Sequence, residues 1–126
     1  MANWGEVLIV DDSSTSRMII QRCFQMAGIE ASGFAFAENG VDAIAVLKEK
    51  PGIGLILTDI NMPKMDGHTF ARLIKSDART SSIPLVVISS IADGALVADL
   101  KAVGVLSVIK KPVSPAKILE ALGGAS

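Results

Sequence analysis

The stretch VLIVDDSS, residues 7–14, decides the fold of this chain. Its first four residues are apolar and mostly β-branched, without the in-out alternation of a half-exposed strand, which is typical of a strand covered on both faces. Two aspartates and two serines follow at once, and such residues commonly cap the start of a helix. The stretch therefore predicts a buried strand that leads into a helix, which is the opening unit of a parallel sheet.

The same unit recurs along the chain. Strands are predicted at residues 7–10, 33–37, 55–57, 85–88 and 107–110. Apolar residues with the 3.6-residue period of a helix lie between and after them, at residues 20–27, 43–47, 70–74, 96–103 and 118–122. Strict alternation of this kind predicts right-handed crossovers with helices on both faces of the sheet. The expected fold class is α/β, a flavodoxin-like doubly wound (βα)5 sandwich with a five-stranded parallel sheet of order 2-1-3-4-5.

Length and composition fit one small domain. The chain has 126 residues, and we expect a single domain over residues 1–126 with no second domain attached. Half of the residues are hydrophobic but only 4% are aromatic, which suits a core of buried parallel strands. Twelve Lys and Arg against thirteen Asp and Glu give a net charge of −1, so neither nucleic acid nor an anionic membrane is an expected partner.

The single cysteine and the hydropathy of the chain indicate its cellular compartment. Cys23 is the one cysteine of the chain and lies among apolar residues at helical spacing. We predict that it is a reduced, buried core residue of a cytosolic protein. The amino terminus lacks the cationic region of a signal peptide, and no stretch has the roughly 18 to 20 apolar residues that a membrane span needs. We therefore expect a soluble, cytoplasmic protein.

Polar side chains gather where the predicted strands end. Asp11 and Asp12 follow the first strand, Asp59 the third, Ser89 the fourth and Lys111 the fifth. In a doubly wound sheet, ligands bind outside the carboxyl ends of the strands, beside the point where the strand order reverses. The first and third strands flank that point, so the pattern predicts that these side chains surround one cleft.

The carboxylates of this cleft indicate a metal site. Three carboxylates so close together repel one another, and a hard divalent cation is the expected compensation. Mg²⁺ favours oxygen ligands and is typically held by one or two carboxylates together with phosphate oxygens. Asp11, Asp12 and Asp59 supply the carboxylates, and the backbone carbonyl of Asn61 can add a further ligand.

The same cleft contains groups suited to a phosphoryl group. Ser89 can donate a hydrogen bond to a phosphoryl oxygen, and Lys111 supplies a compact positive charge. A carboxylate acts as a nucleophile toward phosphorus once a metal and a lysine neutralise the charge on the transferring group. Asp59 is the best candidate because it ends the most central strand, whereas Asp11 and Asp12 are adjacent and better placed as a metal-binding pair.

Each of these features also has an ordinary explanation. Asp-Asp-Ser-Ser can simply cap a helix, Asp66-Gly67 is typical of a turn and helix cap, and Lys-Pro or a serine after a strand is unremarkable. The shared position of these side chains favours a functional site over these explanations. Independent caps and turns have no need to place acidic, hydroxyl and basic groups at one edge of one sheet.

The sequence closely resembles the receiver domains of bacterial response regulators over essentially its whole length. The spacings from Asp59 to Ser89 and from Ser89 to Lys111 also resemble those of the family. The segments that carry the resemblance are VLIVDDS (7–13), AENG (37–40), LTDINMPKMDG (57–67), VIS (87–89) and KKP (110–112).

The resemblance implies a phosphorylation-controlled signalling module of a two-component system. In this view Asp59 accepts a phosphoryl group from a sensor histidine kinase or phosphotransfer protein, the three aspartates and the Asn61 carbonyl bind Mg²⁺, and Ser89 and Lys111 contact the phosphoryl group. The chain is then no enzyme for outside substrates and catalyses only its own phosphorylation and slow dephosphorylation. Phosphorylation shifts an inactive-active equilibrium and remodels the face formed by the fourth helix, fifth strand and fifth helix, which binds a downstream target protein.

One departure from the family concerns the switch. Three residues before the lysine, the family often carries a Tyr or Phe that changes rotamer on activation, but this sequence has Val108. The aromatic part of the switch therefore cannot operate here, and Ser89 and the fourth helix are left to carry the signal. The chain is similar to stand-alone receivers such as chemotaxis regulators, and a phosphate relay or sink within a phosphorelay is the alternative.

Three other functions are weaker interpretations. A Mg²⁺-dependent phosphatase or phosphotransferase would favour a second aspartate two residues after the nucleophile, where this chain has Asn61. A flavin-binding protein needs a phosphate loop after the first strand, where Asp11 and Asp12 would repel the flavin phosphate. A degenerate receiver used only for docking is disfavoured because the site residues are present.

Overall fold

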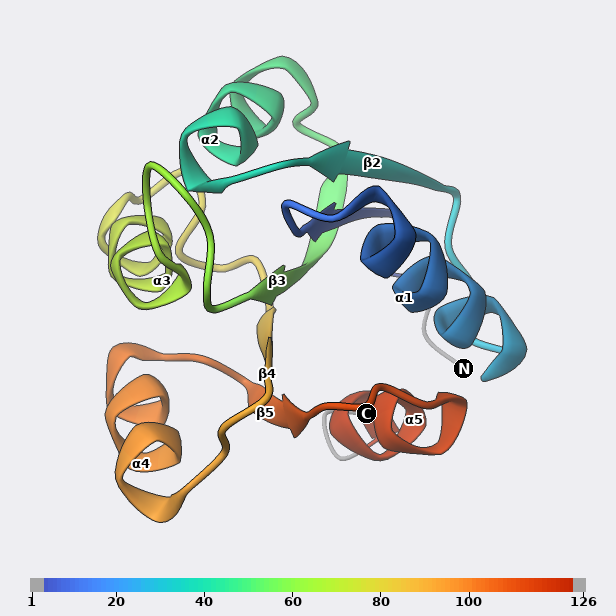
Figure 1. Cartoon of the computed structure of the whole chain (residues 1–126). Helices are drawn as coiled ribbons and strands as arrows, with labels where there is room; N and C mark the ends of the chain where they lie inside the picture. Colours follow the sequence, from blue (N-terminus) through green and yellow to red (C-terminus); the bar gives the residue numbers. More distant parts are fainter. Residues whose placement is uncertain (1–3, 124–126) are drawn as a thin grey trace.

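The computed structural model describes residues 4–123, through which strands and helices alternate (Figure 1). Each predicted strand and helix has an observed counterpart at the expected place in the chain. The elements are β1 (Glu6–Val10), α1 (Ser14–Met26), β2 (Gly33–Ala37), α2 (Gly40–Glu49), β3 (Ile53–Asp59), α3 (Gly67–Ser76), β4 (Leu85–Ser89), α4 (Gly94–Val103), β5 (Ser107–Lys110) and α5 (Pro115–Gly123).

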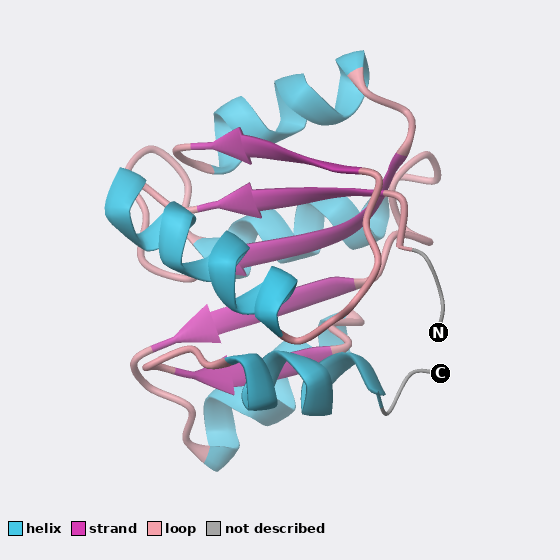
Figure 2. Ribbon diagram, turned by 90° about the vertical axis from the view of Figure 1, so that its right-hand side faces the viewer, coloured by secondary structure: helices cyan, strands magenta, loops and turns pink. Residues whose placement is uncertain are grey.

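The strands form one parallel sheet in the order β2-β1-β3-β4-β5. They run in a common direction, with helices on both sides of the sheet (Figure 2). One face is covered by α1 and α5, and the other by α2, α3 and α4 (Figure 1). The prediction of a flavodoxin-like doubly wound fold with this strand order is therefore confirmed.

The boundaries of β3 differ from the prediction. Residues 55–57 are only the middle of this strand, which begins at Ile53 and ends at Asp59. Gly54 allows the early start, because a Cβ atom there would lie 2.1 Å from the carbonyl oxygen of Trp4. A glycine inside an apolar run weakens the sequence signal for a strand, although here it serves a close approach of two backbones. The strand also ends later than predicted, so Asp59 is its last residue.

The two faces of the sheet bury separate apolar clusters because alternate residues of each strand point to opposite sides. On the side of α2, α3 and α4, the buried side chains include Leu8, Val10, Ile56, Phe70, Ile74, Val87 and Leu100. On the side of α1 and α5, they include Val7, Ile9, Phe24, Leu57, Ile88, Ile118 and Leu122. Such double coverage explains why the strands have continuous apolar sequences.

Cys23 is half-buried, so the prediction of a fully buried core cysteine is wrong. Only Ile20 and Phe24 of α1 are buried against the sheet, and Cys23 packs at the margin of their cluster. Its Sγ atom lies 3.9 Å from the carbonyl oxygen of Val113. Helical spacing places a residue on the inner side of a helix but does not fix how far the neighbouring helix covers it.

Side-chain caps define where the helices begin. Ser13, Asn39, Asp66 and Asp93 each accept a hydrogen bond from the backbone N–H three residues later. The predicted cap at Asp66 is therefore confirmed, and it starts α3 directly after the loop that follows Asp59. Within residues 4–123, no helix combines the length and apolar character needed to cross a membrane.

The attachment of α4 and β5 is weaker than that of the other elements. Among the described residues of α4, Leu100 alone is buried. The strand beside it, β5, has four residues and lies at the edge of the sheet. This corner of the fold is held by less buried apolar surface than the centre.

Candidate functional site

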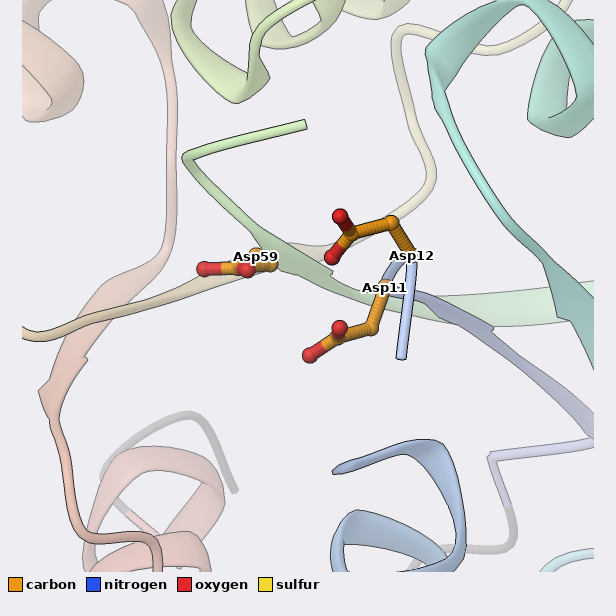
Figure 3. A group of neighbouring side chains, drawn as sticks. All are labelled: Asp11, Asp12 and Asp59. Carbon is orange, nitrogen blue, oxygen red and sulfur yellow. The ribbon is translucent and has the colours of Figure 1, made fainter. Parts of the chain in front are cut away.

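Three aspartates lie together at the carboxyl edge of the sheet (Figure 3). In the pairing of β1 with β3, Val10 lies opposite Thr58, and the next residue of each segment is an aspartate, Asp11 or Asp59. Asp12 follows in the loop before α1. One carboxylate oxygen of each aspartate lies within 4.8 Å of the others. The strand register thus brings together the three carboxylates that the sequence placed in one cleft.

Asp11 is 1% exposed, and both its carboxylate and its backbone carbonyl accept hydrogen bonds. Its Oδ1 atom accepts a bond from the Ser13 backbone N–H at 2.9 Å, and its Oδ2 atom accepts one from the Ser16 hydroxyl at 2.6 Å. Its carbonyl oxygen accepts a bond from Nη1 of Arg17 at 2.6 Å. Ser16 and Arg17 were not predicted as part of the site, although the first turn of a helix that follows a strand lies near the end of that strand.

Asp59 is buried and faces a positive charge. Its Oδ1 atom accepts a 2.8 Å hydrogen bond from the Ile60 backbone N–H and lies 3.4 Å from Nζ of Lys111. Burial raises the pKa of Asp59; Lys111 opposes the rise, and the nearby charge of Asp11 adds to it. The net result is a raised pKa, so the one lysine does not fully offset the cost of holding this charge inside the pocket.

The loop after β3 is packed tightly behind Asp59. Gly67 donates its backbone N–H to the carbonyl oxygen of Ile60 at 2.7 Å. A Cβ atom on Gly67 would lie 2.5 Å from the carbonyl oxygen of Asp59, so a glycine is required for this approach. Asn61, whose carbonyl is a predicted ligand, is exposed within this loop. The loop is therefore closed onto the end of β3 by the start of α3.

Ser89 ends β4 and Lys111 directly follows β5, and both of these strands lie on the side of β3 away from β1. Ser89 is 1% exposed, and its hydroxyl oxygen accepts a hydrogen bond from the Ile91 N–H at 3.1 Å. Its carbonyl oxygen accepts a bond from the Lys111 N–H at 2.8 Å, which ties the loop after β5 to β4. Asp59 pairs with Ile88 across β3 and β4, which places Ser89 one residue further along the neighbouring strand.

The composition of the pocket fits a hard cation. Its donors are carboxylate oxygens from Asp11, Asp12 and Asp59, with no nitrogen or sulfur ligand in the group. Their combined charge exceeds that of Lys111, and Mg²⁺ suits oxygen donors of this kind. A phosphoryl group beside the cation would meet the Lys111 ammonium, which is a common pairing for phosphate. The arrangement can therefore neutralise and orient a phosphoryl group close to Asp59.

A doubly wound α/β domain with an acidic trio and a lysine at the switch point of its sheet is typical of one class of protein, the small signalling modules of two-component systems. Comparison with known families agrees with this class. The family model described as the response regulator receiver domain matches residues 7–123, and the chain belongs to this family.

The relatives of the chain include chemotaxis proteins. Chemotaxis protein CheY1 of Helicobacter pylori is 35% identical over 117 residues, which are 93% of each chain. Sensor histidine kinase CheAY of the same organism is 41% identical over 85 residues, which are 67% of this chain and 10% of the kinase. Among solved structures, the CheX-CheY-BeF3-Mg²⁺ complex from Borrelia burgdorferi matches with a TM-score of 0.82 and 30% identity, covering 95% of this chain and 87% of that one. The chain is thus similar to receivers of the chemotaxis type.

Proposed function

We propose that this chain accepts a phosphoryl group on Asp59 in a Mg²⁺-dependent reaction and thereby switches its binding to a downstream protein. The observation that carries the proposal is the setting of Asp59. Asp59 is 6% exposed, its carboxylate has carboxylate oxygens of two further aspartates within 4.8 Å, and the Lys111 ammonium lies 3.4 Å from its Oδ1 atom. A buried carboxylate with a cation-binding pair and a fixed positive charge beside it is suited to act as a nucleophile.

The proposed reaction forms a bond between an Asp59 oxygen and phosphorus while the bond from phosphorus to the donor atom breaks. The donor atom leaves with the electron pair of that bond. Oδ1 of Asp59 accepts the Ile60 N–H and lies 3.4 Å from Nζ of Lys111, so Oδ2 has more free lone pairs and is the proposed attacking oxygen. Lys111 and the Ser89 hydroxyl stabilise the phosphoryl oxygens. Attack by water later releases phosphate and restores the carboxylate, so the chain catalyses only its own phosphorylation and dephosphorylation.

The cation required for this reaction would be held by Asp11, Asp12, Asp59 and the carbonyl of Asn61. Three of these groups are the clustered carboxylates, which gives a donor set made of oxygen. When bound, Mg²⁺ neutralises charge on the transferring group and on Asp59. Asp11 and Asp12 are adjacent and suited to bind the cation as a pair. Asp59 lies close to both this pair and Lys111, so it is the proposed acceptor.

Treatment with acetyl phosphate tests the acceptor directly. The chain is incubated with acetyl phosphate and Mg²⁺, and the intact mass is measured by mass spectrometry. We expect one phosphoryl adduct on the wild-type chain, none with EDTA, and none on Asp59→Asn. Asp99→Asn is the matched control, because Asp99 is exposed on α4, and it should be labelled like the wild type. An undiminished adduct on Asp59→Asn would refute the assignment.

We further propose that the phosphoryl donor is a sensor histidine kinase or phosphotransfer protein. The relative described as a sensor histidine kinase contains a segment similar to this chain, and this supports a donor of that class. Transfer from a purified phosphohistidine protein, followed by loss of label from that protein, tests the proposal. Labelling by acetyl phosphate without labelling by any phosphohistidine donor would reject this donor class while leaving Asp59 as the acceptor.

The proposed binding face is formed by α4, β5 and α5. Its support is the weak attachment of α4, which buries Leu100 alone among its described residues, and the exposure of Ile91, which is 60% exposed in the loop before α4. Amide NMR spectra recorded before and after addition of Mg²⁺ and beryllofluoride test this face. We expect the largest shifts outside the pocket in α4, β5 and α5, and none of them in Asp59→Asn. Shifts confined to residues around the pocket would argue against a switch.

A phosphate relay or sink is the second candidate, and Val108 favours it. Val108 is half-buried against the apolar cluster on the α4 side and has no ring that could change rotamer. A relay or sink needs phosphoryl transfer but no remodelled face. Fast return of the phosphoryl group to a phosphohistidine protein, together with unchanged amide shifts in α4, would identify this function.

A further inference from the structure

Ser16 lies outside the set of residues assigned above, yet it contacts that set directly. Its hydroxyl donates a 2.6 Å hydrogen bond to Oδ2 of Asp11, a side chain that is 1% exposed. A hydrogen bond to a carboxylate at this distance is charge-assisted and is stronger than a bond between neutral groups. Ser13 donates to the Asp11 carboxylate through its backbone N–H, whereas Ser16 donates through its side-chain hydroxyl.

We infer that Ser16 is a positioning residue for the cation, and this inference rests on the proposed function. The Asp11 carboxylate can take several orientations, and the bonds from Ser13 and Ser16 fix one of them. In that orientation one Asp11 oxygen lies within 4.8 Å of carboxylate oxygens from Asp12 and Asp59. Without the hydroxyl, a carboxylate that repels both neighbours is free to rotate away from them. Ser16 thus keeps the ligand set assembled before the cation arrives.

The hydrogen bond and the cation do not compete for Asp11. An ionised carboxylate offers about four lone-pair sites, and the bonds from Ser13 and Ser16 occupy two of them. The remaining sites are available to a metal. Outer donors that orient a metal-binding carboxylate typically change metal affinity by about 10- to 100-fold when they are removed.

The local structure allows the hydroxyl to be removed without harm to the helix. The cap of α1 uses the backbone N–H of Ser16, which donates to Oγ of Ser13 at 3.2 Å and is unaffected by a change of side chain. Alanine is also a better helix former than serine. In Ser16→Ala, a role limited to helix structure therefore predicts unchanged Mg²⁺ binding, whereas a positioning role predicts weaker binding.

Isothermal titration of the metal-free chain with MgCl2 tests the inference without measuring phosphorylation. We expect Ser16→Ala to raise the Kd for Mg²⁺ by about tenfold. Ser16→Thr, which keeps a hydroxyl at the same place, should stay within about threefold of the wild type. Thr15→Ala is the matched control, because it removes a hydroxyl from the exposed neighbouring residue of the same turn, and its Kd should equal that of the wild type.

The outcomes separate this inference from the proposed function. A wild-type chain that binds Mg²⁺ and is phosphorylated on Asp59, with an unchanged Kd in Ser16→Ala, would overturn the role of Ser16 alone. Equal weakening in Ser16→Thr and Ser16→Ala would also overturn it, because the hydroxyl would then not be the cause. A wild-type chain that binds no Mg²⁺ would refute the proposed function and this inference together.

Discussion

Replacing Asp59 by asparagine should stabilise the chain when no divalent cation is present. The change keeps the shape of the side chain and the oxygen that accepts the Ile60 N–H, but it removes the charge. At an effective dielectric constant of about 20, the attraction between Asp59 and Lys111 at 3.4 Å is about 5 kcal/mol. Repulsion from the carboxylates of Asp11 and Asp12, each within 4.8 Å, is about 7 kcal/mol in total. Repulsion therefore exceeds attraction by about 2 kcal/mol.

The burial of Asp59 acts in the same direction, because it raises the pKa of this carboxyl and so opposes its charge. Solvent around the exposed Asp12 weakens its share of the repulsion. We therefore expect Asp59→Asn to gain about 1 to 2 kcal/mol in free energy of unfolding, or about 5 °C in Tm. The wild type should gain more than the variant when Mg²⁺ is added, since a cation stabilises the state that binds it.

Urea denaturation in EDTA and in excess MgCl2, followed by far-UV circular dichroism, measures both effects. Asp99→Asn serves as the control, and its stability should stay within about 0.5 kcal/mol of the wild type in both buffers, as is usual for an exposed residue. A variant that is less stable than the wild type in EDTA would show that the pocket tolerates three carboxylates without a cation. The proposed metal site would then lose its electrostatic support.

Three further predictions concern α3, its cap and the loop that follows it. Gly67→Ala should lower the free energy of unfolding by about 2 kcal/mol, because its Cβ would lie 2.5 Å from the Asp59 carbonyl oxygen. Gly94→Ala is the control: its Cβ would have nothing within 4 Å, so the variant should be as stable as the wild type or more stable in the same thermal melts. Asp66→Ala should cost about 1 kcal/mol at pH 7 by loss of the α3 cap. The hydrogen bond from the Thr69 N–H lowers the pKa of Asp66, so this contribution is fully present above the ordinary carboxyl pKa and is lost as pH falls through the lowered folded-state pKa. A cost that does not shrink as the pH is lowered would contradict it. Lys75→Met should lower the free energy of unfolding by about 1 to 3 kcal/mol, because Nζ of Lys75 donates to the carbonyl oxygens of Ser81 and Ile83 at 3.1 and 2.7 Å. An unchanged urea midpoint would show that water replaces the lysine as donor to these carbonyls.

The fold could be predicted from the sequence because its signals are local and repeated. Short strand signals, clearest in the apolar runs at residues 7–10, 55–57 and 85–88, alternate with helical periods along the chain. Few arrangements other than a doubly wound sheet cover such strands on both faces. The predicted order then placed Asp11, Asp12 and Asp59 at one edge. The structure brings these three together, whereas their roles as ligands or acceptor remain proposals to be tested by the experiments above.

The parts that could not be predicted depend on side-chain packing. The hydroxyl of Ser16 reaches Asp11 only because α1 leaves the strand at a particular angle, and residue spacing does not encode that angle. The early start of β3 is hidden by Gly54, whose role is to let another backbone pass. The exposure of Cys23 depends on how far α5 extends over α1, which periodicity in one helix does not report.

The pairing of β1 with β3 determines what a register error would do to this chain. Val10 opposite Thr58 fixes the register that brings the two strand-end aspartates side by side. A slip of one residue would turn every side chain of a strand to the other face, so the apolar cores and the acidic cluster would be lost in the same event. A chain with this register error would therefore lose the proposed phosphorylation site together with its packing.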